Sequence, residues 1–155
     1  MTPRQCVRAL LLSPDSSVLL IRMEVGKGEF WMTPGGGIAE GETHQEALQR
    51  ELQEEVGLEG ATIGPHIWVR EAIFTWQGKR IHEREHFYLV RTERFEPDST
   101  NNPVTQEREL MAELKWWPVG ELPPNSARFA PSRLGELTSR LLQHGVPETP
   151  IDTGY

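Results

Sequence analysis

Apolar residues along the chain fall into short runs that are separated by polar, turn-forming segments. Runs of this length, rich in aliphatic and aromatic residues and bounded by Gly, Pro, Ser or Asn, are typical of β-strands. The pattern predicts strands at residues 7–12, 18–23, 30–33, 67–76, 81–90 and 114–119. The first two runs are separated by the turn-forming sequence SPDSS, so we expect them to pair as an antiparallel hairpin.

Two segments show the period of an amphipathic helix instead. Residues 43–56, THQEALQRELQEEV, place an aliphatic residue at every fourth position of their second half. Thr43, with Glu46 three residues later, matches a capping box, and Gly57 is a typical helix stop. Leucines at helical spacing predict a second helix at residues 132–142.

Helices among several strands, without regular βαβ alternation, indicate an α/β fold in which helices cover the faces of a mixed sheet. The 155 residues are enough for one domain, which we expect at residues 1–145, and the proline-bearing residues 146–155 are expected to form a flexible, frayed tail. Residues 34–37, PGGG, predict a tight turn. Residues 95–108 form a long polar loop of the kind that often carries function.

Composition and charge narrow the classes of function. With 37% hydrophobic and 25% charged residues the chain is globular, and a net charge of −7 argues against a nonspecific grip on nucleic acid polymers or anionic membranes. The first apolar run is too short for a signal peptide or a membrane span, so we expect a cytoplasmic protein. Cys6 is the only cysteine, which excludes an internal disulfide and a cysteine-based metal site.

Three carboxylates, Glu51, Glu54 and Glu55, lie within an arc of roughly 100° on the predicted helix. Like charges at this spacing weaken a helix by a few tenths of a kcal/mol per pair, and a bound cation would reverse that effect. Hard cations such as Mg²⁺ prefer oxygen ligands and are usually bound through one or two carboxylates together with substrate phosphates. The spacing therefore indicates a divalent-cation site shared with a phosphate. Arg50 lies beside Glu54, where it would orient that carboxylate.

The residues before this helix favour the same interpretation. Gly35, Gly36 and Gly37 let the backbone come close to an anion or a metal, because a Cβ atom there would block the approach. Glu42 stands at the helix start, where the macrodipole favours negative charge, so a purely structural role for it remains open.

The histidines do not indicate a second site. His82 and His86 are four residues apart in a predicted strand, where this spacing covers about 13 Å, so they imply neither a two-histidine metal site nor a relay. His44 is expected to be exposed at the start of the helix.

Residues 36–58 fit the pattern G-x5-E-x7-R-E-U-x-E-E-x-G-U, where U is a bulky aliphatic residue, without departure. The matching residues are Gly36, Glu42, Arg50, Glu51, Leu52, Glu54, Glu55, Gly57 and Leu58. This stretch resembles the Nudix hydrolase box, and the preceding WMTPGG resembles the family's usual entry to it. The similarity covers about residues 4–143 and implies the family's α/β/α sandwich with a mixed central β-sheet.

The resemblance also implies a reaction, the metal-dependent hydrolysis of a phosphoanhydride bond in a nucleoside diphosphate linked to another group X. The expected cofactor is Mg²⁺ or Mn²⁺, the substrate is a small nucleotide or nucleotide conjugate, and the family's frequent dimers imply a homodimer. The implied metal ligands are Glu51, Glu54, Glu55 and the carbonyl of Gly35, with Arg50 in the catalytic machinery and Gly36, Glu42 and Gly57 in supporting roles.

The general base remains open, because Nudix enzymes often recruit it from outside the box. Glu51 either binds the metal or orients or deprotonates the attacking water. Glu85, Glu107, Glu109 and Glu113 are candidates outside the box, and Glu109 is the first choice.

Substrate recognition is not specified by the box. Trp76 or Phe74, near a predicted hairpin tip, could stack on a base, with Glu85 on the neighbouring strand as a further substrate-binding candidate. Two other classes of function stay in view. A sensor that binds a nucleotide without hydrolysing it would not need the intact box, and an isomerase acting through a protonating cysteine would have to use Cys6.

Overall fold

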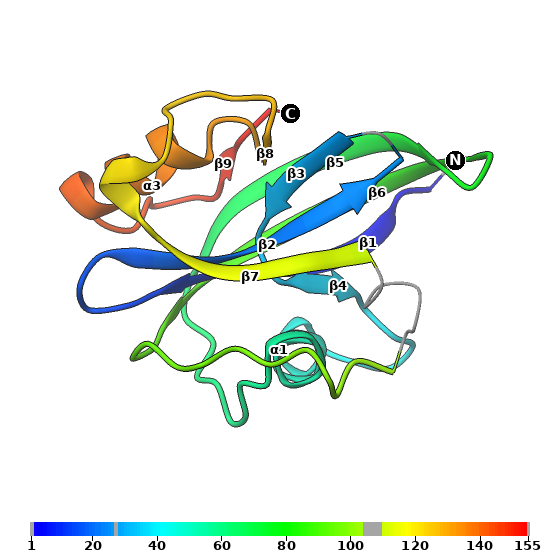
Figure 1. Ribbon diagram of the computed structural model, residues 1–155, viewed down its shortest axis with the longest axis horizontal. Coiled ribbons are helices and arrows are strands. Elements are labelled where there is room, and N and C mark those ends of the chain that lie inside the picture. The colour runs from blue at the N-terminus through cyan, green and yellow to red at the C-terminus, as the bar shows by residue number, and fades with distance from the viewer. Residues whose placement is uncertain (1, 27, 104–109, 155) are drawn as a thin grey trace.

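The computed structural model describes residues 2–26, 28–103 and 110–154, and Figure 1 shows its elements. In chain order they are β1 Arg4–Leu12, β2 Ser17–Val25, β3 Gly28–Met32, β4 Gly35–Gly37, α1 His44–Val56, β5 His66–Trp76, β6 Lys79–Arg91, β7 Met111–Pro118, the 3-10 helix η1 Val119–Glu121, β8 Phe129–Ala130, α3 Leu134–His144 and β9 Ile151–Asp152. All six predicted strands and both predicted helices are present, with ends that differ by a few residues.

The strands form a mixed sheet with the order β8-β3-β2-β1-β6-β5-β9, to which β4 is added on β1 and β7 on β2. β1 and β2 pair only next to their turn, at Leu12 and Val18. Further along, β1 pairs in parallel with β6 and antiparallel with β4, whereas β2 pairs with β3 and β7. The predicted hairpin is thus confirmed only at its turn, and its two strands then belong to different parts of the sheet.

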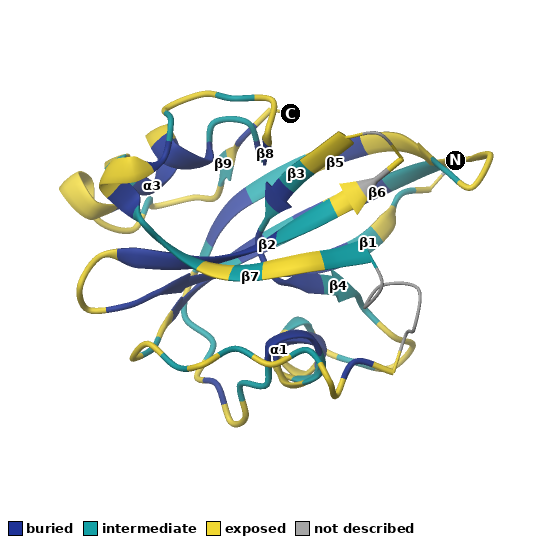
Figure 2. Ribbon diagram, viewed as in Figure 1, coloured by how far each residue is buried: buried dark blue, intermediate teal, exposed yellow. Residues whose placement is uncertain are grey.

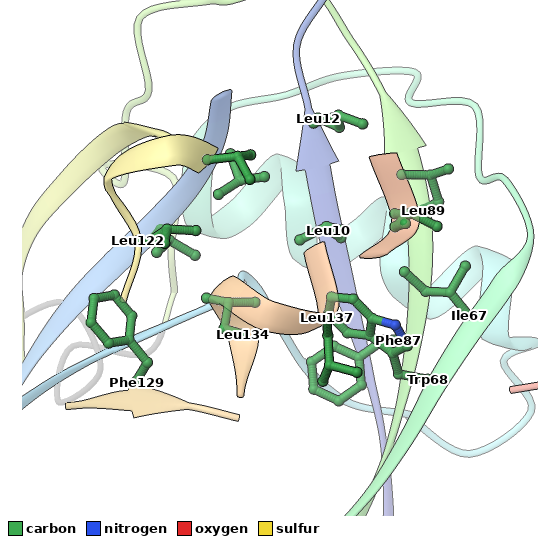
Figure 3. Packing of buried hydrophobic residues seen from close by; sticks show 14 of the residues in the cluster. Leu10, Leu12, Ile67, Trp68, Phe87, Leu89, Leu122, Phe129, Leu134 and Leu137 are labelled. Atoms are coloured by element: carbon green, nitrogen blue, oxygen red, sulfur yellow. The ribbon is translucent and has the colours of Figure 1, made fainter. Parts of the chain in front are cut away.

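The sheet lies between α1 and α3, which cover opposite faces (Figure 1). Alternation along β1 explains the two layers: Leu10 and Leu12 point into the cluster that contains the leucines of α3, whereas Ala9 and Leu11 pack with α1. Figure 3 shows the α3 side, where Leu134 and the other labelled side chains pack together. The buried strands run through the centre of Figure 2 and separate the two helical layers.

Helix α1 begins and ends where its sequence predicts. The Oγ1 atom of Thr43 accepts from the Glu46 backbone N–H at 3.1 Å, and the Glu46 carboxylate accepts from the Thr43 backbone N–H at 2.9 Å. Gly57 adopts φ 78°, a left-handed conformation that favours glycine, and ends the helix. The capping box and the stop are both confirmed, so the register of the acidic face is determined locally.

Two predictions based on glycine and proline were wrong. Residues 34–37 do not form only a turn, because Gly35–Gly37 pair with β1 as the short strand β4. The pairing requires glycine: a Cβ atom on Gly35 would lie 2.0 Å from the carbonyl oxygen of Val7. The frayed end expected after residue 146 is also not found at residues 151–153, since β9 pairs with β5 and the buried Thr153 donates its backbone N–H to Val69.

Candidate active site

The carboxylates of the box lie where α1 faces β4. Glu51 and Glu55 are buried, at 9% and 7% exposure, and Glu54 is partly covered. A carboxylate oxygen of Glu55 accepts the backbone N–H of Gly35 at 2.6 Å. Glu51 lies against Gly36, where an added Cβ would be 2.6 Å from its carboxylate. The acidic face of the helix and the glycine strand therefore form one site.

Arg50 links the two ends of the box. Its guanidinium holds both carboxylate oxygens of Glu42, through Nε at 2.7 Å and Nη2 at 2.9 Å, in the bidentate geometry that arginine favours. Nη1 also contacts Glu51 at 2.9 Å and Glu54 at 3.4 Å, and Nη2 donates to the carbonyl of Gly37 at 3.0 Å. Arg50 thus contacts Glu54, but its shortest contact is with Glu42.

This contact changes the acidity of Glu42. Hydrogen bonds from Arg50, helped by the backbone N–H of Ala39, outweigh partial burial and lower the pKa of Glu42 to about 2. The pKa of the Arg50 guanidinium rises correspondingly, chiefly because of its hydrogen bonds to Glu42. Both groups therefore remain charged at neutral pH and hold the loop before α1 onto the helix.

The donor set suits a hard cation. Three carboxylates and the backbone carbonyls of β4 all offer oxygen atoms as ligands, and the lack of a side chain on Gly36 leaves room for the Glu51 carboxylate. Within the ranges that the structure describes, no three Asp, Glu, His or Cys side chains are arranged as a metal's ligand set. Glu54 instead accepts a hydrogen bond from Arg50, and Glu55 accepts one from the Gly35 backbone N–H. Hydrogen-bond donors of the protein therefore contact both carboxylates.

A second group of charges lies next to β4, on the sheet strands β1, β5 and β6. The buried Arg8 donates through Nε to Glu85 at 2.8 Å and through Nη1 to the Gly35 carbonyl at 3.0 Å. Arg70 binds the other carboxylate oxygen of Glu85, and Arg4 binds the neighbouring Glu83 at 2.9 Å. Burial opposes ionisation of Glu85, but Arg8 and Arg70 outweigh it and lower the pKa of its carboxyl.

The residues predicted outside the box lie in different surroundings. Glu85 reaches this charged group but is only 4% exposed, and both of its oxygens are bound by arginine. Phe74 and Trp76 lie near the turn of the β5–β6 hairpin, where Phe74 is 41% exposed. Glu113 on β7 pairs with Arg22 at 3.2 Å. Glu107 and Glu109 lie outside the described residues.

Sequence reasoning missed Arg8. Its one visible signal is a charged residue inside the apolar run VRALLL, where a strand buried on both faces should have an apolar side chain. Cys6, two residues earlier, has no exposed surface, and burial raises the pKa of its thiol to about 12. A buried thiol in this position does not favour the cysteine-dependent isomerase.

Comparison with known proteins decides the family. The family model of the NUDIX domain matches residues 2–138. The chain belongs to the Nudix family. The expected Nudix resemblance is thereby confirmed over all of the strands except β9, all of α1 and the first part of α3.

Relatives of this Nudix domain are named as hydrolases. The RNA pyrophosphohydrolase of Sphingopyxis alaskensis is 31% identical over 129 residues, covering 77% of this chain and 80% of the relative. That of Rhizobium meliloti is 30% identical over 142 residues, covering 81% and 85%. The chain is accordingly a Nudix pyrophosphohydrolase, as the box predicts.

Solved structures show the same fold. The MutT Nudix hydrolase from Burkholderia pseudomallei has a TM-score of 0.63 and 27% identity, covering 87% of this chain and 96% of that one. The solution structure of the E. coli ORF135 protein has a TM-score of 0.64 and covers 96% of each chain at 23% identity. The predicted α/β/α sandwich is confirmed. Among the described residues, no helix is long and apolar enough to span a bilayer.

Proposed function

We propose that this Nudix pyrophosphohydrolase uses Mg²⁺ or Mn²⁺ to hydrolyse a phosphoanhydride bond in a nucleoside diphosphate linked to a further group. The observation that carries the proposal is the junction of α1 and β4, where Glu51 lies against Gly36 and Glu55 holds the Gly35 amide. The intact box, with each of its charged residues engaged at this junction, supports hydrolysis over a sensor that only binds the nucleotide.

The residues have distinct roles in this proposal. Glu51, Glu54, Glu55 and the Gly35 carbonyl would hold the cation, which when bound lowers the pKa of water and neutralises phosphoryl charge. Arg50 holds Glu51 and Glu54 at the contacts given above and ties them to β4 through Gly37. An alternative role proposed for Glu51 is to orient or deprotonate the attacking water, and Glu109 stays a proposed base.

Removing single box carboxylates tests the reaction. In Glu54→Gln and Glu55→Gln we expect turnover to fall by at least about 100-fold, since an amide keeps the shape but not the charge that a cation needs. Hydrolysis of a panel of nucleotides and nucleotide conjugates with Mg²⁺, with products resolved by mass, measures this.

Glu59→Gln serves as the matched control for these two variants, because Glu59 is exposed just beyond the helix. It should keep wild-type activity. Near-normal turnover in both box variants would contradict the assignment. Tight binding of one nucleotide by a wild-type protein that hydrolyses nothing would favour the sensor.

A second substrate class is suggested by the relatives named RNA pyrophosphohydrolases. The 5′ end of a triphosphorylated RNA contains the same phosphoanhydride bonds, so the same site could act on it. The net charge of −7 favours a small substrate over a long polyanion. Comparing kcat/KM for a nucleoside triphosphate and for a short 5′-triphosphorylated RNA separates the two classes, and a preference for the RNA would overturn the small-molecule proposal.

Three further parts of the proposal concern the rest of the molecule. Phe74 and Trp76 remain proposed stacking residues for a base. The position of Glu85 is better explained by its pairing with Arg8 and Arg70 than by substrate binding.

We also propose that the protein forms a homodimer, which analytical ultracentrifugation would test, and that it acts in the cytoplasm, which cell fractionation would test.

A further inference from the structure

Strand β4 has no side chains with which to anchor itself, because it consists of Gly35, Gly36 and Gly37. Its backbone is held by polar contacts from two sides. Arg50 of α1 donates to the Gly37 carbonyl at 3.0 Å, and Arg8 of β1 donates to the Gly35 carbonyl at the same distance. Arg50 belongs to the box. Arg8 lies on the opposite side of β4, and the proposed reaction does not assign it a role.

Arg8 is an unusual residue for its position. Its side chain is 10% exposed, and it points from the central strand β1 into the α3 side of the sheet, on which Leu10 and Leu12 also lie. Replacing a buried ion pair by apolar residues is often neutral or stabilising, so stability alone is a weak reason for this charge. The contact that distinguishes Arg8 from an ordinary buried ion pair is its hydrogen bond to the Gly35 carbonyl.

The Gly35 peptide is held only through its backbone. Gly35 has φ +149° and no room for a Cβ atom, so its orientation depends on contacts of its backbone, which include the pairing with β1. Its N–H donates to Glu55 at 2.6 Å, and its carbonyl accepts from Arg8 at 3.0 Å. Both polar groups of Gly35 are therefore held, one by the catalytic helix and one by the sheet.

Arg8 is itself held in place by Glu85. The Nε atom of Arg8 binds one oxygen of Glu85, and Arg70 binds the other, while a second carboxylate, Glu83, lies 4.0 Å from Nη2 of Arg8. These carboxylates offset part of the guanidinium charge beside the proposed cation site. The chain of contacts runs from Arg70 through Glu85 and Arg8 to the Gly35 carbonyl.

We infer that Arg8 is a positioning residue of the active site, which directs the Gly35 carbonyl toward the cation and is held for this purpose by Glu85. The inference rests on the proposed function, in which this carbonyl is a metal ligand. A carbonyl oxygen has two lone pairs, so it can accept from Arg8 and bind a cation at the same time. Partners of this kind, which orient a metal's direct ligands, commonly change metal affinity by 10–100-fold.

The test is a direct titration of Mn²⁺ into the protein without substrate, followed by electron paramagnetic resonance. Arg8→Met keeps the length of the side chain but removes both hydrogen bonds, and we expect Mn²⁺ to bind about tenfold more weakly. Arg8→Lys keeps the charge but cannot hold Glu85 and Gly35 with a planar fork, so its affinity should lie between those of wild type and Arg8→Met. Arg133→Met, which breaks an exposed ion pair with Glu136, is the matched control and should bind Mn²⁺ as wild type does.

Equal or tighter Mn²⁺ binding after the loss of Arg8 would contradict the inference. If Arg8 acted only as a nearby positive charge, its removal would strengthen Mn²⁺ binding, so equal or tighter binding by a folded Arg8→Met variant would overturn the inference. Should that variant fail to fold by circular dichroism, Glu85→Gln decides: about threefold weaker binding supports the inference, and unchanged binding overturns it. If the wild-type protein hydrolyses nucleotides and the Arg8 and Glu85 variants bind Mn²⁺ as tightly as it does, the inference about Arg8 is wrong but the proposed function stands. If the wild-type protein neither binds Mn²⁺ nor hydrolyses nucleotides, both the inference and the proposed function are wrong.

Discussion

Single residues at the α1–β4 junction show how closely the site is packed. Gly36 is the first glycine of the box, and it faces the carboxylate of Glu51 directly. The surrounding charges leave Glu51 little freedom to move aside, because Arg50 holds one of its oxygens at 2.9 Å. Glycine is needed here for space and not for its backbone conformation, since the φ of Gly36 is not positive. A side chain as small as a methyl group would therefore displace a proposed metal ligand.

Gly36→Ala tests this steric requirement. The added Cβ would lie 2.6 Å from the Glu51 carboxylate, so we expect kcat/KM to fall by about tenfold or more while the fold is retained. Steady-state kinetics and circular dichroism measure the two effects. Gly120→Ala is the matched control, because a Cβ there meets no atom within 4 Å. Equal activity in the two variants would show that Glu51 can move without cost.

Three elements meet in a group of aromatic side chains beneath the start of α1. His44 begins α1, His66 lies on β5, and His86 and Tyr88 lie on β6. The ring of His86 is 4.8 Å from that of His44 and 5.2 Å from that of His66, and His44 shares a 2.7 Å hydrogen bond with Tyr88. The expectation that His44 is exposed was wrong, because the helix start packs on the sheet. Contacts between these rings therefore attach the start of α1 to β5 and β6.

Acid should weaken this attachment. Burial, then the charges of His44, His66 and Arg84, lower the pKa of His86 to about 4, although Glu71 acts in the opposite direction. An unfolded histidine titrates near 6.5, so the unfolded chain binds more protons between these values. The stability that neutral His86 contributes is thus present above about pH 6.5 and is lost as the pH falls toward 4.

His86→Gln keeps a donor for the hydrogen bond with Gln5 but removes the titration. We expect the free energy of unfolding to decline less between pH 7 and 4.5 than in wild type, by about 1 kcal/mol after allowing for solvent screening. Urea denaturation at the two pH values measures it. The same decline in both proteins would mean that other groups govern the acid sensitivity.

The whole molecule depends on contacts between distant parts of the chain. The C-terminal strand β9 pairs with β5, where Ile151 lies opposite Trp68 and packs against the core on the α3 side. Thr153 is fully buried and donates to the Val69 carbonyl at 3.0 Å. In Figure 1 the end of the chain returns to the sheet beside α3. The last residues therefore cover an edge of the sheet that would otherwise be open.

Deleting residues 150–155 tests this contribution. Loss of the Ile151 side chain and of the Thr153 hydrogen bond should lower the free energy of unfolding by about 2 kcal/mol, with little change in hydrolysis at 25 °C. Thermal and urea unfolding measure the stability. Glu148→Ala is the control, since Glu148 is exposed. Unchanged stability after the deletion would show that β9 is only a peripheral contact.

The local signals in the sequence explain how far prediction could go. Capping by Thr43 and Gly57 and the spacing of the carboxylates depend on neighbours within one or two turns, and these features are confirmed. The β5–β6 hairpin is similarly local, because Gln77 and Gly78 adopt the positive φ values that a two-residue turn requires. The short strand β4 could not be predicted this way, since its pairing depends on β1 approaching from a distant part of the chain.

The sequence by itself determined the register of the acidic helix, because its caps and spacing are local, and the continuous box indicated the family and, through the resemblance, the reaction class. Only the tertiary structure decided which groups from other elements complete the site beside that helix. Parallel pairing of β1 with β6 brings Arg8 next to Glu85, 77 positions away, and β4 brings the Gly35 carbonyl to both the helix and Arg8. Contacts of this kind depend on which strands pair in the folded protein, so they cannot be predicted from the spacing of residues along the chain.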